Sequence, residues 1–475
     1  MQEMMKMNEI ISYIEAKKDE LIKISDQIWD YAELKNQEFK SAALLSTALA
    51  HEGFAISENV AGLKTAFVAE AGKGSPIIGF LGEYDALPDL SQEAGETTRK
   101  PVIQGGAGHG CGHHILGTAA MGAAVVVKKY LEDHKIPGTI RFYGCPAEEG
   151  GSGKVIMGRA GSFDDVEAAI TWHPTDDNNI WSMNFLATLF ATFHFEGIAA
   201  HSASQGHLGR SALEAVELMN VGANYLRAHV TRDVCINYAV LDAGGIAPNT
   251  IQAEATVAYL LRANTQAETQ RVFERLVDIA QGAALMSGTK MSYHIDSGTS
   301  ELIPNRALER IMYDKFVQVG PVPIDEDDIA FAKEIRKSFP KNAEESTISI
   351  LKMLYGSVAD EIVPRIRGKL INDCIYPYVP IEMAKYGSTD VCDVSWYTPV
   401  AQVTTACYAK DTPGHSWQET AQGKTNLCHK GMLTAAKVMA LTGIELVVNP
   451  ASLKAVRDEY CQKRQGRDYV CPLPE

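Results

Sequence analysis

The sequence predicts an α/β protein in which a smaller α+β domain is inserted into a larger sheet-containing domain. Through about residue 180, short apolar runs alternate with helical patterns, which is the rhythm of an α/β sheet. From about residue 186 to residue 297, long β-rich segments dominate instead, separated by two amphipathic helical stretches. A chain of 475 residues with 46% hydrophobic residues is also long enough to bury the cores of two domains.

These observations predict three consecutive parts. Residues 1–186 form the first part of the larger domain, residues 187–300 form the inserted domain, and residues 301–475 complete the larger domain. Within the last part, residues 305–385 are richer in charge and in helical patterns. We predict that this segment is a helix-rich elaboration, and the sequence assigns it no chemical role.

Three apolar runs of the larger domain end in polar residues. Ligand sites of open α/β sheets collect at the carboxyl ends of the strands, so these polar residues are expected to converge. The runs are 77–81, 139–143 and 168–172, and they lead into Asp85, into Glu148 and Glu149, and into His173, respectively.

The inserted domain is predicted from its own alternation of elements. The predicted strands are 187–195, 235–240, 251–261 and 291–295, and the predicted helices are 211–228 and 266–286.

Glu148 and Glu149 are adjacent, although neighbouring residues of a strand point to opposite faces. Both carboxylates reach one site only where the chain turns, and the following Gly150 and Gly151 allow that turn. One carboxylate can then hold a metal ion while the other takes a proton from the attacking water. The alternative for an acidic pair is a solvated face.

Cys111 and His113 are two residues apart and offer thiolate and imidazole, which are good ligands for zinc. The apolar pattern that follows is helical, so the helix dipole would favour the thiolate. A buried thiol beside a loop histidine is the alternative. His173 and His415 have alternatives too, as a core histidine and as a loop residue, but one metal site explains all of them together.

Composition excludes several functions. The formal charge of −15, without a basic stripe, argues against nucleic acid as a partner. The longest apolar stretch, 115–127, is shorter than the roughly 20 residues that span a membrane, so no membrane contact is expected. The first residues lack the apolar block of a secretory signal, and the nine scattered cysteines fit unpaired thiols in a reducing compartment. We therefore expect a cytoplasmic protein.

Seven motifs, taken in order, resemble the M20 metallopeptidase family in its amidohydrolase branch. The resemblance covers nearly the whole chain. The motifs are Gly82-Glu-Tyr-Asp-Ala-Leu-Pro88, His109-Gly-Cys-Gly-His113, Cys145-Pro-Ala-Glu-Glu-Gly-Gly-Ser-Gly153, Trp172-His-Pro174, Gly197-Ile-Ala-Ala-His-Ser-Ala203, Gly244-Gly-Ile-Ala-Pro-Asn249 and Pro413-Gly-His-Ser-Trp417.

The resemblance implies a metal-dependent-exopeptidase-like catalytic domain that binds two divalent ions, zinc or manganese. It implies that Cys111 bridges the ions and that Glu148 is the general base. The remaining implied ligands are His113 and His173 for one ion and Glu149 and His415 for the other. Asp85 resembles the carboxylate that orients a metal-bound imidazole through its other ring nitrogen.

The resemblance also implies that the inserted domain dimerises the protein and closes over the cleft. His201 resembles a lid histidine that reaches the partner subunit's site and stabilises the oxyanion. Asn249 and Arg262 resemble groups that hold the substrate carboxylate. Taken by themselves, Arg262 could be a rim charge and Asn249 a turn residue. The sequence departs from the family at His114, where relatives place an aspartate or asparagine.

The expected activity is hydrolysis of the amide bond of an N-acyl or aroyl amino acid, with p-aminobenzoyl-glutamate as the expected substrate. A dipeptidase or a general aminoacylase would use the same site. A third hypothesis is a subunit that is inactive without a homologous partner chain, so both a homodimer and a heterodimer are expected assemblies.

Overall fold

The computed structural model describes residues 2–385 and 387–474, and its described residues form two compact units. Unit 1 comprises Met1–Asn184, Ile303–Met383 and Val394–Arg467. Unit 2 comprises Phe185–Leu302 together with two short pieces from the end of the chain, Ala384–Asp393 and Asp468–Glu475. Both units combine helices with a sheet, so the predicted α/β class is confirmed.

The sheet of unit 1 has seven strands in the order β1-β2-β4-β3-β5-β15-β6. The neighbours β4, β3, β5 and β15 run parallel, which brings their carboxyl ends to one edge. The three predicted strands are confirmed as β3, β4 and β5. The strand bounds are β1 Ala55–Glu58, β2 Phe67–Lys73, β3 Ile77–Glu83, β4 Gly138–Cys145, β5 Ala168–Thr175, β6 Asn179–Ile180 and β15 Val400–Ala406.

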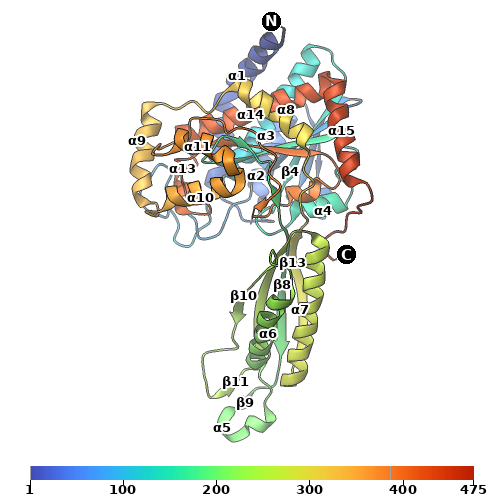
Figure 1. Ribbon diagram of the computed structural model, residues 1–475, viewed down its shortest axis with the longest axis vertical. Coiled ribbons are helices and arrows are strands. Elements are labelled where there is room, and N and C mark those ends of the chain that lie inside the picture. Colours follow the sequence, from blue (N-terminus) through green and yellow to red (C-terminus); the bar gives the residue numbers. More distant parts are fainter. Residues whose placement is uncertain (1, 386, 475) are drawn as a thin grey trace. The chain divides into compact units, whose positions relative to one another are not determined.

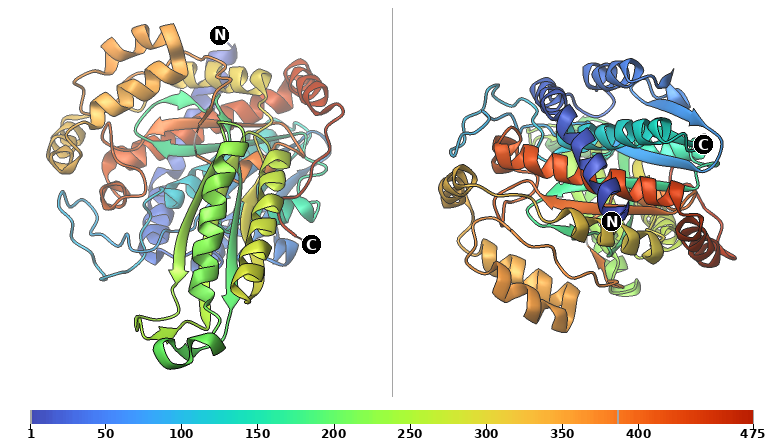
Figure 2. Two further views of the ribbon diagram at one scale, coloured as in Figure 1. Left: turned by 60° about the horizontal axis from the view of Figure 1, so that its bottom comes forward. Right: turned by 90° about the horizontal axis from the view of Figure 1, so that it is seen from above.

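Three long helices, α1 (Gln2–Tyr31), α3 (His113–Asp133) and α14 (Asn426–Val448), pack together in the core of unit 1 (Figure 2). Helix α3 is buried almost throughout its first fifteen residues because it contains mostly small and apolar side chains. Helix α14 is long and apolar enough to cross a membrane, but 83% of its most apolar window is buried inside the protein. A core helix of a globular protein has these properties.

The other helices of unit 1 include four in the predicted helix-rich segment. Of these, α8 contributes Leu308, Met312 and Phe316 to the main core. The bounds are α2 Phe39–His51, α4 Gly153–Arg159, α8 Arg306–Val319, α9 Glu326–Ile335, α10 Ala343–Tyr355, α11 Ala359–Ile366, α13 Trp417–Gln422 and α15 Pro450–Arg464, and the short elements β7 Asn184–Phe185, β14 Ala384–Lys385 and α12 Val391–Val394 complete this part of the chain.

Unit 2 has an antiparallel sheet in the order β10-β12-β8-β13, with two long helices (Figure 1). The prediction of one strand over 251–261 is wrong in one respect, because the chain leaves the sheet at Gln252 and Ala253 and divides it into two strands. The bounds are β8 Ala187–Glu196, β9 Ala200–His201, α5 Ser202–Gln205, α6 Ala212–Leu226, β10 Cys235–Asp242, β11 Thr250–Ile251, β12 Glu254–Ala263, α7 Gln266–Ser287 and β13 Lys290–Thr299.

Candidate metal centre

Three neighbouring strands of unit 1 deliver polar residues to one edge of the sheet. Strand β3 ends at Glu83, just before Asp85, and its last residue pairs with Cys145 at the end of β4. Strand β4 leads into Glu148 and Glu149, and His173 lies near the end of β5. The parallel register therefore brings these side chains together, as the strand pattern predicted.

The turn after β4 presents both glutamates. The N–H groups of Gly150 and Gly151 donate to the carbonyl oxygens of Glu148 and Ala147, at 2.6 and 3.0 Å. Gly153 closes the turn, because a Cβ at this position would overlap the carbonyl oxygen of Pro146. The chain is thus turned where the adjacent carboxylates need it to be.

Cys111 and His113 come from the loop that enters α3. Gly112 caps this helix with φ +73°, and a Cβ there would overlap the Tyr408 hydroxyl and the Pro174 ring. The tight turn at Gly112 places the cysteine and the histidine on either side of the helix start, where the helix dipole favours an anionic ligand.

His415 comes from a loop between β15 and α13, with a left-handed φ of 51°. Its backbone N–H donates to the Gly110 carbonyl oxygen at 3.0 Å and to Glu419 Oε2 at 3.1 Å. These contacts join the His415 loop to the loop that contains Cys111.

The potential ligand atoms form two groups that share Cys111. Cys111, His113 and His173 form one group, and Cys111, Glu149 and His415 form the other. Within each group the ligand atoms lie within 4.8 Å of one another. Cys111 Sγ lies 3.4 Å from His173 Nε2, and His415 Nε2 lies 3.6 Å from Glu149 Oε1. Two donor sets with one common thiol have the composition that a pair of cations requires.

Each histidine of the first group is held by its other ring nitrogen. His113 Nδ1 lies 2.9 Å from Asp85 Oδ1, and the second oxygen of Asp85 accepts the backbone N–H of Glu149 at 2.9 Å. His173 Nδ1 lies 2.9 Å from the Pro174 carbonyl oxygen, and its ring stacks on Trp181 with centroids 4.8 Å apart. Both Nε2 atoms are thereby aimed toward Cys111.

Burial dominates the protonation of this donor set. It raises the pKa of the Cys111 thiol well above its usual value and raises the pKa of Glu149. Burial by itself lowers the pKa of His113, but Cys111 and Asp85 outweigh it and raise that pKa well above its usual value. Protons occupy such a site unless another positive charge replaces them.

Two buried polar atoms of the set have no hydrogen-bond partner, His113 Nε2 and Glu149 Oε1. Glu83 Oε2 lies 3.3 Å from His113 Nε2 without hydrogen-bond geometry. Buried polar atoms are normally satisfied, so these atoms are suited to hold a cation.

Glu83, Lys154 and Glu419 lie at this centre and were not predicted. Glu83 joins His113 and Glu148 in a third group with ligand atoms within 4.8 Å, and its other oxygen lies 2.6 Å from the buried Lys154 ammonium. Each has a signal in the sequence: Glu83 ends a strand, Lys154 follows the glycine cluster, and Glu419 is one helical turn beyond His415.

His114 takes no part in these groups. It is buried in α3, with Nε2 2.8 Å from the Gly423 carbonyl oxygen, and its ring lies 5.0 Å from the ring of His109. Burial, with His109 beside it, lowers the pKa of His114 well below its usual value. The departure from the family pattern at this position is therefore a neutral core histidine and not a competing ligand.

The other three predicted site residues belong to unit 2. His201 pairs with Thr250 across β9 and β11, and the Asn249 carbonyl oxygen accepts the Ser202 N–H at 3.0 Å, so His201 and Asn249 are neighbours at one end of the unit (Figure 1). Arg262 lies near the other end of β12, with its Nε buried and without a hydrogen-bond partner.

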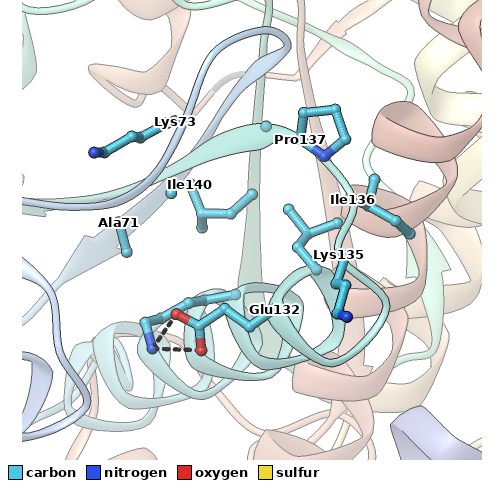
Figure 3. A pocket seen from close by; sticks show the side chains of 11 residues that line it. Ala71, Lys73, Glu132, Lys135, Ile136, Pro137 and Ile140 are labelled. Atoms are coloured by element: carbon cyan, nitrogen blue, oxygen red, sulfur yellow. Dashed lines mark hydrogen bonds and ion pairs between the residues drawn. The ribbon is translucent and has the colours of Figure 1, made fainter.

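A separate pocket of about 360 Å³ opens at the other end of β4, beside Gly138 and Ile140 (Figure 3). Its rim includes Lys73, Lys128 and Lys135, and Lys128 is paired with Glu132. Because Glu148 and Glu149 follow the carboxyl end of the same strand, this pocket is not part of the metal centre.

The family model for peptidase family M20/M25/M40 matches residues 79–461. The chain belongs to this family, so the predicted resemblance is confirmed, and it is a hydrolase of amide bonds.

The chain is 43% identical to one of the two subunits of p-aminobenzoyl-glutamate hydrolase of Escherichia coli (strain K12), over 97% of this chain and 96% of that protein. It is 26% identical to the Xaa-Arg dipeptidase of Mus musculus, over 93% of this chain and 89% of that one. A dinuclear metal-binding M20 peptidase from Bacillus subtilis shares the fold, with a TM-score of 0.55 at 16% identity, covering 91% of this chain and 99% of that chain.

Proposed function

We propose that the protein is a two-metal amidohydrolase that cleaves N-acyl amino acids, with p-aminobenzoyl-glutamate as its substrate. The observation that carries the proposal is the pair of donor groups sharing Cys111, with Glu148 at their edge. The substrate is supported by 43% identity over nearly the full length of a relative named for hydrolysis of that compound.

The donor set fits two divalent cations. Cys111 would bridge them, with His113 and His173 on one ion and Glu149 and His415 on the other. Imidazole and carboxylate suit zinc and manganese alike, and the thiolate favours zinc. When bound, such ions supply Lewis-acid activation of water and of the amide carbonyl.

The residues of the chain supply the proton transfers. Glu148 takes the proton of the attacking water and returns it to the leaving amine nitrogen. Asp85 holds His113 in one orientation through their 2.9 Å contact. His201 stabilises the oxyanion, while Asn249 and Arg262 bind the carboxylate of the amino acid.

We propose that these last three residues reach one site from two copies of the chain, or from one copy and a homologous subunit. Arg262 is eight residues along β12 from Glu254, the end near His201, which is about 26 Å at roughly 3.3 Å per residue. One copy therefore does not bring Arg262 and His201 together. The edge strand β10 suits subunit pairing because its outward side chains Tyr238, Val240 and Leu241 are apolar and exposed.

Two other functions use the same centre. A dipeptidase is supported by the 26% identical Xaa-Arg dipeptidase, and a general aminoacylase differs only in the acyl group that it accepts. The 43% identical relative is named as one of two different subunits, which also favours a chain that needs a second polypeptide. The unpaired state of all nine cysteines fits a cytoplasmic enzyme.

A substrate panel tests the proposal. The purified chain, supplied with zinc or manganese, is assayed on N-aroyl glutamates, N-acetyl amino acids and dipeptides, alone and with a homologous subunit. We expect p-aminobenzoyl-glutamate to be hydrolysed with the highest kcat/KM. A higher value for dipeptides or N-acetyl amino acids would contradict the substrate assignment, and activity only in the mixture would favour the obligate-partner hypothesis.

Two variants test the general base and the lid. Glu148→Gln removes the proton acceptor, so we expect activity to fall at least about 100-fold while both metals stay bound. His201→Ala is expected to be similarly inactive. When the two chains are co-expressed, hybrid dimers contain one site with both groups intact and should regain activity. Absence of recovery in isolated hybrids would show that His201 does not act across a subunit interface.

A further inference from the structure

The helix-rich segment contacts the chain on both sides of the metal centre through a cluster of charged side chains within unit 1. The cluster consists of Arg336 and Glu344 from this segment, Lys410 and Asp411 from the loop that leads to His415, and Asp176 from the end of β5. Neither the proposed chemistry nor the sequence patterns used these residues.

The contacts within the cluster are short and shielded. Lys410, with 1% of its side chain exposed, donates to Asp411 Oδ2 and to Glu344 Oε1 at 2.9 Å each. Arg336 donates to the fully buried Asp411 carboxylate at 2.9 Å. Water screens such buried pairs little, so they hold the two segments together more strongly than surface ion pairs would.

The cluster also connects the two ligand loops. The Asp411 N–H donates to Asp176 Oδ2 at 2.5 Å. Asp176 is three residues beyond His173, and Asp411 is four residues before His415. Each donor group thus has one histidine whose chain segment ends in this cluster.

An apolar cluster provides a second, independent contact between the same parts. Val322, Ala332, Ile335 and Ile371 of the helix-rich segment pack with Ala406, Ala409, Ala421 and Leu427, which lie on both sides of His415. The Lys410 N–H also donates to the Leu370 carbonyl oxygen at 2.8 Å.

His415 needs such support because its own surroundings are sparse. Its side chain is 58% exposed, and its backbone adopts a left-handed φ of 51°, which is unfavourable for a non-glycine residue. Asp411 in the same loop has φ 68°. A loop with two left-handed residues keeps its shape only when neighbouring contacts hold it.

We infer that residues 322–371 brace the loop that contains His415, with Arg336 and Glu344 as positioning residues for the metal centre. This inference rests on the proposed function for its catalytic consequence. The brace itself fixes the spacing of the His173 and His415 segments, and it gives the helix-rich segment a role.

Arg336→Met and Glu344→Gln each remove one contact of the brace without deleting a ligand. The matched control is Arg367→Met, because Arg367 pairs with Glu345 at 2.8 Å in the same segment but both side chains are about half exposed or more. Arg336→Lys keeps the charge and should recover part of the effect.

Two measurements separate positioning from general stability. Hydrogen exchange of peptides covering residues 409–416 is compared in the metal-free proteins, and zinc affinity is measured by competition with a chromophoric chelator. We expect Arg336→Met and Glu344→Gln to exchange faster in this loop and to bind one of two zinc ions about 10-fold more weakly or worse. The control and the exchange of α3 should match the wild type.

Loop exchange and zinc affinity equal to those of Arg367→Met in both variants would overturn the brace. A general rise in exchange, including α3, would also overturn it, because the cluster would then act on overall stability. If the wild type binds no zinc, the proposed function fails, while the exchange comparison still decides the brace.

Discussion

Asp393 is a carboxyl group of unit 2 with no exposed surface. Its two oxygens accept the Ser300 N–H at 2.9 Å and the Tyr469 hydroxyl at 2.8 Å. These donors favour the ionised form, but burial outweighs them and raises the pKa of Asp393 to about 7. The folded protein therefore holds a proton here that the unfolded chain releases at a lower pH.

Asp393→Asn tests this at the residue scale. Between about pH 4 and pH 7 the folded state binds more protons than the unfolded state, so this residue makes stability fall as pH rises through that window. Asparagine does not titrate, and its amide can accept from Ser300 and donate to Tyr469. We expect the unfolding temperature of the variant, relative to wild type, to be higher at pH 8 than at pH 5. An unchanged difference between the two pH values would contradict the raised pKa.

At the scale of an element, the turn between β4 and α4 determines where the two glutamates lie. Gly153→Ala places a methyl group where the Pro146 carbonyl oxygen lies, so the turn must open. We expect a stability loss of about 1–3 kcal/mol, as for other overpacked sites, and a fall in kcat, because Glu148 moves from its position. Chemical denaturation and steady-state kinetics measure the two effects.

The control for this turn is Gly282→Ala in the interior of α7, where an added Cβ meets nothing within 4 Å. Alanine should stabilise this helix by roughly 0.5–1 kcal/mol and leave kcat unchanged. If Gly153→Ala behaved like this control, the turn would be more adaptable than the structure indicates.

At the scale of the whole molecule, the two units have separate hydrophobic cores. One core is formed around α3 and α14, and the other lies between the β8–β12 sheet and helices α6 and α7. The proposed cations contact only unit 1 residues, whereas unit 2 contains no group of three potential ligands among the residues that the structure describes.

Removal of metal should therefore act unequally on the two units. Ions bound only to the folded state stabilise it by mass action. We expect a chelator to increase hydrogen exchange in α3 and β5 and to leave β8 and β12 unchanged, with recovery after zinc or manganese is added. Equal loss of protection in both units would contradict a metal centre confined to unit 1.

Much of the molecule follows from local sequence. The runs that became β3, β4 and β5 are apolar stretches bounded by polar and glycine residues, so their strand character needs no distant contact. The same holds for the paired Glu148 and Glu149 followed by glycines. The family resemblance supplied the ligand assignments, which no spacing of residues could have supplied alone.

The sequence by itself determined the α/β class, the strands that end at the site and the residue types suited to metal binding, because these depend on local periodicity and side-chain chemistry. Only the tertiary structure decided that Glu83 and Lys154 pair beside His113, that His114 lies in the core, and that Arg336 reaches Asp411. These contacts join residues from about 70 to more than 300 positions apart, and their geometry depends on how whole elements pack.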